Sequence, residues 1–239
     1  MTTAIAAPPK PKSRDLAALA DLMLALEPGR QVTISPVGWA AYDYLLEVRE
    51  QAAQRGPRLT YQRGVLTIMT TSGLHESLKK VMALLIESWI DETGGKCTPR
   101  GSLTIRREDL DRGFEPDECY YIQNWSRVFG RHEIDFSIDP PPDLVIEIEV
   151  SRSAVDRLPI MAAFKVPEVW RYDGERLIAL LLQSNATYAE SPTSRALPAL
   201  SLTELVRFLQ MSTTTDYLAI GRQFRAWVRS TLSTPAQTN

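Results

Sequence analysis

The sequence contains little histidine and little cysteine, and this excludes several kinds of site. His75 and His132 are the only histidines among the 239 residues, so a His-rich zinc site is excluded. Cys97 and Cys119 are the only cysteines, and they do not have CxxC spacing. We interpret them as free thiols in a reducing compartment, with a single disulfide bridge as the alternative.

Long apolar runs and a strong net charge are also lacking. No apolar run is long enough to cross a membrane, and no signal-peptide pattern is present, so we expect a cytoplasmic protein without a membrane partner. The formal net charge of −2 excludes the strongly basic surface of a protein that coats nucleic acid. It does not exclude an enzyme with a local basic groove.

The patterns that are present predict one folded domain. Residues 1–14 are rich in Ala, Pro and Lys and are expected to form a disordered leader, and residues 15–239 show no repeat and no dividing linker. Helical spacing predicts helices over 15–26, 36–54, 74–93, 153–163, 202–209 and 216–232. Alternation predicts strands over 31–34, 59–63, 65–70, 101–106, 118–122, 134–138, 144–150, 169–173, 176–182 and 186–190. This order indicates an α/β or α+β fold with a mixed sheet.

One predicted strand carries two acids on the same face. Because side chains alternate along a strand, Glu147 and Glu149 point to the side of Val145, while the apolar residues between them point to the other side. Buried charges are costly unless they are paired or bind a metal. The alternative is an edge strand whose second face is exposed to water.

A third acid precedes another predicted strand. Asp117 follows Pro116 at the head of the strand over 118–122. Carboxylates from neighbouring strands can hold a divalent cation such as magnesium, which activates water against a phosphodiester, and a nearby Lys or Arg can orient the phosphate. Pro-Asp pairs also begin strands for purely structural reasons, since both residues suit turns.

Several segments together resemble a known family of bacterial nucleases. The matching segments lie between about residues 33 and 232 and comprise 61–70, His75-Glu76, Glu115-Pro116-Asp117, 121–124, 134–148, 166–172 and 224–229. On these segments the chain resembles the Uma two family of restriction endonucleases, which is abundant in cyanobacteria and belongs to the PD-(D/E)XK nuclease superfamily.

The resemblance implies a fold, a chemistry and a set of site residues. The implied fold is a restriction-endonuclease-like core, in which helices flank a central mixed sheet. The implied activity is hydrolysis of DNA phosphodiester bonds with Mg²⁺ or Mn²⁺, held by Asp117 and Glu147 as metal ligands and catalytic acids. Asp143 also follows a proline, but it is too close to Glu147 on one strand to supply the other half of the motif, so it is the second choice. A homodimer stays open, because nucleases that cut both strands often pair.

The chain departs from the superfamily pattern where a lysine is expected. Glu149 stands two residues after Glu147 in place of that lysine, and Arg157 takes the place that a lysine of the following helix has in many relatives. Glu149 is expected to be either a third metal ligand of the catalytic site or an inert surface acid. An arginine can orient a phosphate but cannot act as a general base. Lys165 is the nearest lysine. The alternative function is therefore a degenerate nuclease fold that binds DNA or a protein without cutting. The net charge of −2 favours a third alternative, a structural homodimer without a nucleic-acid role.

Other residues have both a functional and a structural interpretation. His75 begins a predicted helix and is either a catalytic hydrogen-bonding group or a local packing residue, and Glu76 beside it is either a site acid or a surface acid. Five arginines are expected either to contact phosphates or to lie in solvated turns: Arg106, Arg107, Arg112, Arg127 and Arg131. Trp170 and Trp227 are expected in the core.

Overall fold

The computed structural model describes residues 13–52, 56–150 and 156–233. Almost the whole expected leader, residues 1–14, lies outside the described residues, as does the beginning of the helix expected over 153–163. The chain divides into two compact units. The first contains the described residues up to Ser72 together with Thr104–Glu115, and the second contains Gly73–Leu103 and the described residues from Pro116 onward. A single domain over 15–239 stays a prediction.

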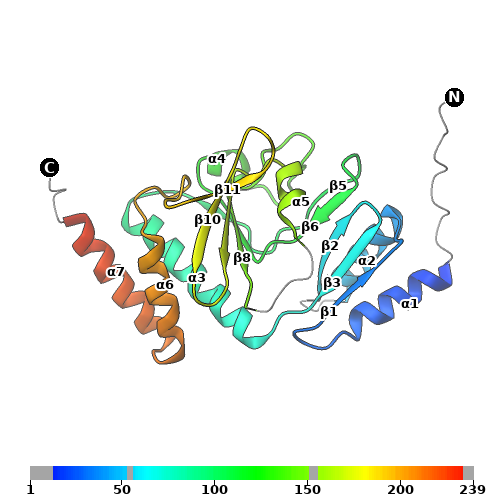
Figure 1. Cartoon of the computed structure of the whole chain (residues 1–239), viewed down its shortest axis with the longest axis horizontal. Coiled ribbons are helices and arrows are strands. Elements are labelled where there is room, and N and C mark those ends of the chain that lie inside the picture. Colours follow the sequence, from blue (N-terminus) through cyan, green and yellow to red (C-terminus); the bar gives the residue numbers. More distant parts are fainter. Residues whose placement is uncertain (1–12, 53–55, 151–155, 234–239) are drawn as a thin grey trace. The chain divides into compact units, whose positions relative to one another are not determined.

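The first unit is an antiparallel sheet with two helices. Its strands are ordered β1-β3-β2-β6-β5 (Figure 1). The apolar side chains of α1, α2, β2 and β3 form one core, in which Tyr42 stacks on Tyr61 with ring centroids 5.0 Å apart. The bounds are α1 Ser13–Leu24, β1 Gln31–Ile34, α2 Trp39–Gln51, β2 Arg58–Gln62, β3 Val65–Met69, β5 Ile105–Arg107 and β6 Arg112–Phe114. The predicted hairpin over 59–70 is confirmed, and Gly64 with φ +85° lies in its turn.

Several expected elements differ from the structure. The strand expected over 101–106 covers only Ile105–Arg107, and three other differences have a local reason. The helix expected from Pro36 begins at Trp39, because the Val37 amide donates to the Gly64 carbonyl at 2.8 Å instead of joining the helix. The charged segment after 106, expected as a simple turn, contains β6 and forms a hairpin with β5. The strand expected over 134–138 is a turn, because the Asp135 carboxylate accepts from Ser137 N at 2.9 Å and the Asp135 carbonyl accepts from Asp139 N at 2.7 Å.

The second unit contains the mixed sheet. Its strands are ordered β11-β10-β9-β8-β7-β4, with β8 and β9 parallel and the other neighbours antiparallel. The bounds are α3 Gly73–Glu92, β4 Thr98–Pro99, β7 Glu118–Tyr121, α4 Trp125–Val128, β8 Leu144–Ile148, α5 Leu158–Ala163, β9 Glu168–Tyr172, β10 Leu177–Leu182, β11 Tyr188–Ser191, α6 Leu202–Gln210, the 3-10 helix η1 Met211–Thr213 and α7 Tyr217–Ser233. The predicted α+β fold with a mixed sheet flanked by helices is confirmed.

Helices α3, α6 and α7 pack together with one face of this sheet (Figure 1). Trp170 is fully buried there, and Trp227 packs against the same core with its ring centroid 5.4 Å from that of Phe224. Both tryptophans are therefore core residues, as expected. Among the described residues, no helix has the length and apolar character needed to cross a membrane.

Strand β8 lies inside the sheet, between β7 and β9. Leu144, Ile146 and Ile148 belong to the core beneath α3, and Val145 and Glu147 on the opposite face are buried as well. The alternative of an edge strand with one wet face is therefore wrong. Glu147 is a buried carboxylate, and its burial has to be offset by specific contacts.

A buried acid on β7 gives a prediction about stability and pH. Burial raises the pKa of Glu118, helped by the charge of Glu87 and opposed by Lys79. A carboxyl whose pKa is raised on folding stabilises the folded state below its unfolded pKa, and this contribution is lost as the pH rises through the folded pKa. The Glu118→Gln protein is therefore expected to be more stable than the wild type at neutral pH, by roughly 0.5–2 kcal/mol.

Urea unfolding at neutral pH and below about pH 4 tests this. The gain in unfolding free energy should vanish at the acidic pH, where the wild-type carboxyl is protonated as well. The exposed Glu133→Gln is the control and should change stability at neither pH. An equal gain for Glu118→Gln at both pH values would contradict the prediction.

Candidate functional site

Asp117 and Glu147 lie on the same face of neighbouring strands. In the antiparallel pair of β7 and β8, Glu118 is opposite Ile146 and Cys119 is opposite Val145. Continuing this register by one residue places Asp117 opposite Glu147, and side chains of directly opposite residues share a face. The Ile148 amide donates to Asp117 Oδ2 at 2.5 Å, which ties the aspartate to the end of β8. Both carboxylates are almost fully buried.

His75 reaches the same aspartate from the first turn of α3. Its Nε2 lies 3.0 Å from Asp117 Oδ2, and its Nδ1 lies 3.4 Å from Glu76 Oε1. Glu76 Oε2 is in turn 3.4 Å from Lys79 Nζ, one helical turn further along. A chain of charged and polar groups therefore leads from the sheet to α3. Lys79 was not expected from the sequence, although its spacing of four residues from His75 is a signal that could have found it.

Glu147 is paired with Arg157. Arg157 directly precedes α5, which begins at Leu158 because Pro159 suits a first turn and cannot lie further inside a helix. Arg157 Nη2 forms an ion pair with Glu147 Oε2, and the two side chains are 9% and 2% exposed. The pair offsets the charge of an acid that water does not reach. The expected basic residue of the following helix thus contacts the acid of β8.

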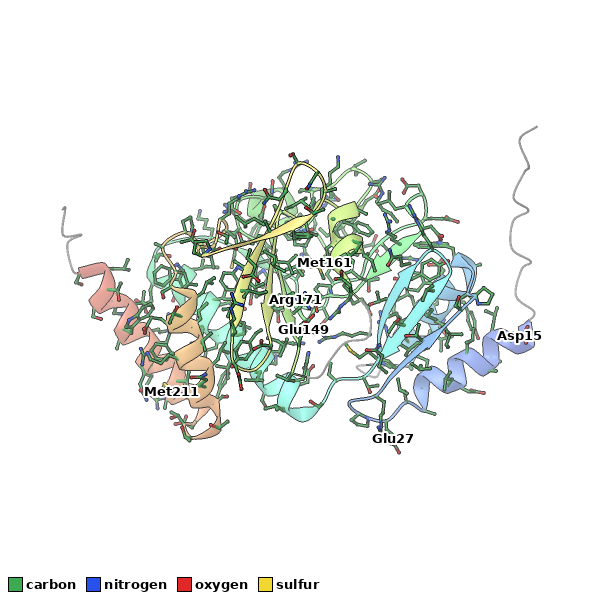
Figure 2. The ribbon with its side chains drawn as sticks, viewed as in Figure 1. Asp15, Glu27, Glu149, Met161, Arg171 and Met211 are labelled. Carbon is green, nitrogen blue, oxygen red and sulfur yellow. The ribbon has the colours of Figure 1, made fainter. Side chains whose placement is uncertain are left out.

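Glu149 forms a separate ion pair with Arg171 of β9. The distance between Arg171 Nη2 and Glu149 Oε2 is 2.5 Å. Figure 2 labels both residues. Glu149 is held in place because its amide donates to the Tyr172 carbonyl at 2.7 Å. Burial lowers the pKa of Arg171, but the hydrogen bond and charge of Glu149 outweigh burial, and the pKa is raised. Arg171 lies in a segment that carried the family resemblance, yet its contact with Glu149 was not expected.

Two other buried acids have structural contacts. Asp143, the second acid that follows a proline, accepts hydrogen bonds from Ile122 N at 2.7 Å, Asn124 N at 2.9 Å and Asn124 Nδ2 at 2.6 Å. Glu168 accepts from Trp170 Nε1 at 2.6 Å and from two main-chain amides at 2.8 Å. These donors explain the burial of both acids without a ligand. For Asp143 this agrees with its place as the second choice in the sequence, whereas nothing in the sequence indicated the role of Glu168.

Most of the other expected basic residues belong to the first unit or form ion pairs with nearby acids. In the first unit, Arg106 pairs with Asp43 and Arg107 pairs with Asp109. In the second unit, Arg131 pairs with Asp139 at 2.5 Å, while Lys165 is exposed after α5 with φ +59°. These pairs favour the interpretation of Arg106, Arg107 and Arg131 as residues of charged turns. Contact with phosphate stays a prediction for Arg112 and Arg127.

The oxygen donors suit a hard cation. Among the residues that the structure describes, no group of three or more His, Cys, Asp or Glu side chains is placed to hold a metal ion. Magnesium commonly takes only one or two carboxylates and completes its shell with water and substrate oxygens. Asp117 and Glu147, opposite each other on one face, provide those two carboxylates, so the donor set fits such an ion.

Comparison with known proteins agrees with the resemblance. Residues 39–214 match the model of the Uma2 family, whose description is "Putative restriction endonuclease". One similar solved structure is that of "a putative nuclease belonging to DUF820" from Anabaena variabilis ATCC 29413, with 18% sequence identity, a TM-score of 0.46, and coverage of 63% of this chain and 90% of that chain. No curated protein matches. Because the family match covers well over half of the sequence, the chain belongs to the Uma2 family.

Proposed function

We propose that this protein is a metal-dependent DNA endonuclease that hydrolyses phosphodiester bonds. The observation that carries the proposal is the register of β7 and β8, which sets Asp117 opposite Glu147 on one buried face. The family to which the chain belongs is described as restriction endonucleases, which favours DNA as the substrate.

Each proposed site residue has a role that follows from its contacts. Asp117 and Glu147 would hold Mg²⁺ or Mn²⁺, and the bound ion would activate water and offset negative charge on the scissile phosphate. His75 lies between Asp117 and Glu76, at 3.0 and 3.4 Å, so both ring nitrogens face an acid and the imidazole is oriented from two sides. Arg157 orients Glu147 through their ion pair.

Cleavage of plasmid DNA tests the proposal. With Mg²⁺ or Mn²⁺ the purified protein should convert supercoiled plasmid to nicked and linear forms. EDTA should stop the reaction, and excess metal should restore it. The Asp117→Asn protein, purified in the same way, controls for contaminating nucleases. Absence of cleavage, or equal cleavage by the two proteins, would contradict the proposal.

A second candidate is a protein that binds DNA or a protein partner without cutting. The observation that favours it is that both acids at the end of β8 are paired with arginines, and that Glu149 stands where a lysine is expected. Calorimetric titration with Mg²⁺ separates the two functions. A nuclease should bind the ion and lose this binding in Asp117→Asn, whereas a binding protein should give no such difference.

A further inference from the structure

We propose that Arg171 is the phosphate-binding residue of the site and that Glu149 positions it. In this arrangement β9 supplies the positive charge that β8 lacks, since β8 carries Glu147 and is followed by another acid, Glu149. The inference rests on the proposed function, because it assigns the residue that binds the phosphate of the same DNA substrate.

The register of the parallel strands places Arg171 beside the acids. Glu147 of β8 is paired with Arg171 of β9 along the ladder, and Glu149 follows β8 by one residue. The Arg171 guanidinium bends to Glu149 and meets its carboxylate at 2.5 Å, and Figure 2 shows the two labelled side chains next to each other. Glu147 also contributes to the raised pKa of Arg171 through its charge. The guanidinium therefore lies within the electrostatic field of both acids.

Exposure separates Arg171 from the other cations that contact site acids. The side chain of Arg171 is 34% exposed, whereas Lys79 beside Glu76 is 14% exposed and Arg157 beside Glu147 is 9% exposed. An exposed guanidinium can meet a DNA phosphate with less rearrangement of the surrounding protein than one that is nearly covered. Arg157 is therefore suited to hold Glu147 inside the protein, and Arg171 is suited to meet the substrate.

The chemistry of the guanidinium allows both contacts at once. It carries five N–H donors in a fixed plane, and the contact of Nη2 with Glu149 leaves others for two phosphate oxygens. Arg171 keeps its proton throughout, so it binds the phosphate and stabilises its charge without acting as a base. Glu149 restricts where the guanidinium can point and is a positioning residue.

DNA binding in EDTA measures this role without cleavage. The affinity for a short fluorescent duplex is measured over a range of salt concentrations for wild type, Arg171→Ala, Arg171→Lys and Arg176→Ala. Arg176 is the matched control, because it directly precedes β10 and forms an exposed ion pair with Glu190 of β11 in the same sheet. Arg171→Ala should bind about tenfold more weakly, with the salt slope reduced by about 1, while Arg176→Ala should behave like the wild type. Arg171→Lys should keep the salt slope and recover part of the affinity.

Cleavage by the same proteins shows whether Glu149 positions the arginine. Glu149→Gln removes a negative charge, so DNA binding should become equal or tighter, yet kcat should fall about tenfold because the guanidinium is no longer held in place. If the ion pair of Arg171 and Glu149 only stabilises the fold, both Arg171→Ala and Glu149→Gln should lower the thermal stability. The salt slope of DNA binding should then stay that of the wild type, and Glu149→Gln should not lower kcat while DNA binding is kept. Equal salt slopes for Arg171→Ala and Arg176→Ala would overturn the inference.

The outcomes also separate this inference from the proposed function. If the wild type binds DNA through Arg171 but does not cut, the nuclease proposal fails and Arg171 stands as a phosphate-binding residue. If the wild type cuts and Arg171→Ala cuts equally well, the nuclease proposal stands and the role of Arg171 is overturned.

Discussion

The Asp117→Asn protein is expected to cleave DNA roughly a thousandfold more slowly than the wild type, because it loses the charge that holds the cation. Asparagine has the same size as aspartate. Ile148 N and His75 Nε2 both contact Asp117 Oδ2, and the asparagine oxygen placed there can still accept from both, so the local structure should be retained. Initial rates of plasmid nicking under saturating Mg²⁺ measure the loss, and circular dichroism checks the fold.

Asp143→Asn is the matched control for this experiment. Asp143 also follows a proline, but its carboxylate accepts three hydrogen bonds from Ile122 and Asn124. Asparagine there should lower the free energy of unfolding by about 1–3 kcal/mol and leave the cleavage rate of the folded protein close to that of the wild type. If Asp143→Asn abolished cleavage and Asp117→Asn did not, the assignment of the motif aspartate to Asp117 would be wrong.

The Arg157→Met protein is expected to lose about 3–5 kcal/mol of unfolding free energy. Methionine occupies a similar length but leaves the Glu147 carboxylate, 2% exposed, without the cation that offsets its burial. Urea unfolding followed by fluorescence measures the loss. The exposed pair of Arg176 and Glu190 gives the control, since Arg176→Met should cost no more than about 1 kcal/mol.

A double variant shows whether the loss comes from the charge. In the Glu147→Gln, Arg157→Met protein the buried carboxylate is absent, so most of the stability lost in Arg157→Met should return. If the double variant were as unstable as Arg157→Met, the loss would come from packing of the arginine stem. If Arg157→Met alone lowered the free energy of unfolding by less than about 1 kcal/mol, the ion pair of Arg157 and Glu147 would be solvated.

The sequence by itself determined most helices and strands of the second unit. The apolar spacing from Leu78 to Trp89 predicts α3, and the alternation around Glu147 places that acid on the face opposite Ile146 and Ile148. These are local patterns, because the side chains of a helix or strand repeat along a single segment. The sequence also indicated Asp117 as the partner acid, through the proline before it and the family resemblance.

Local patterns failed where short polar contacts decide the backbone. Residues 134–138 alternate like a strand but form a turn, because the side-chain and main-chain oxygens of Asp135 accept from amides a few residues further on. The segment after Arg106 is charged like a loop but forms a hairpin, because pairing of β6 with both β2 and β5 supplies its main-chain hydrogen bonds.

Only the tertiary structure decided what surrounds the acids. Alternation shows which way Glu147 and Glu149 point, but the position of β8 between β7 and β9 decides that Glu147 is buried and not on a wet edge. The pairing of Glu149 with Arg171 depends on strand order and register, and the pairing of Glu147 with Arg157 depends on where α5 packs, both of which residues far apart in the sequence establish. The sequence therefore determined where the carboxylates are, and the fold decided which cations meet them and which of these cations solvent can reach.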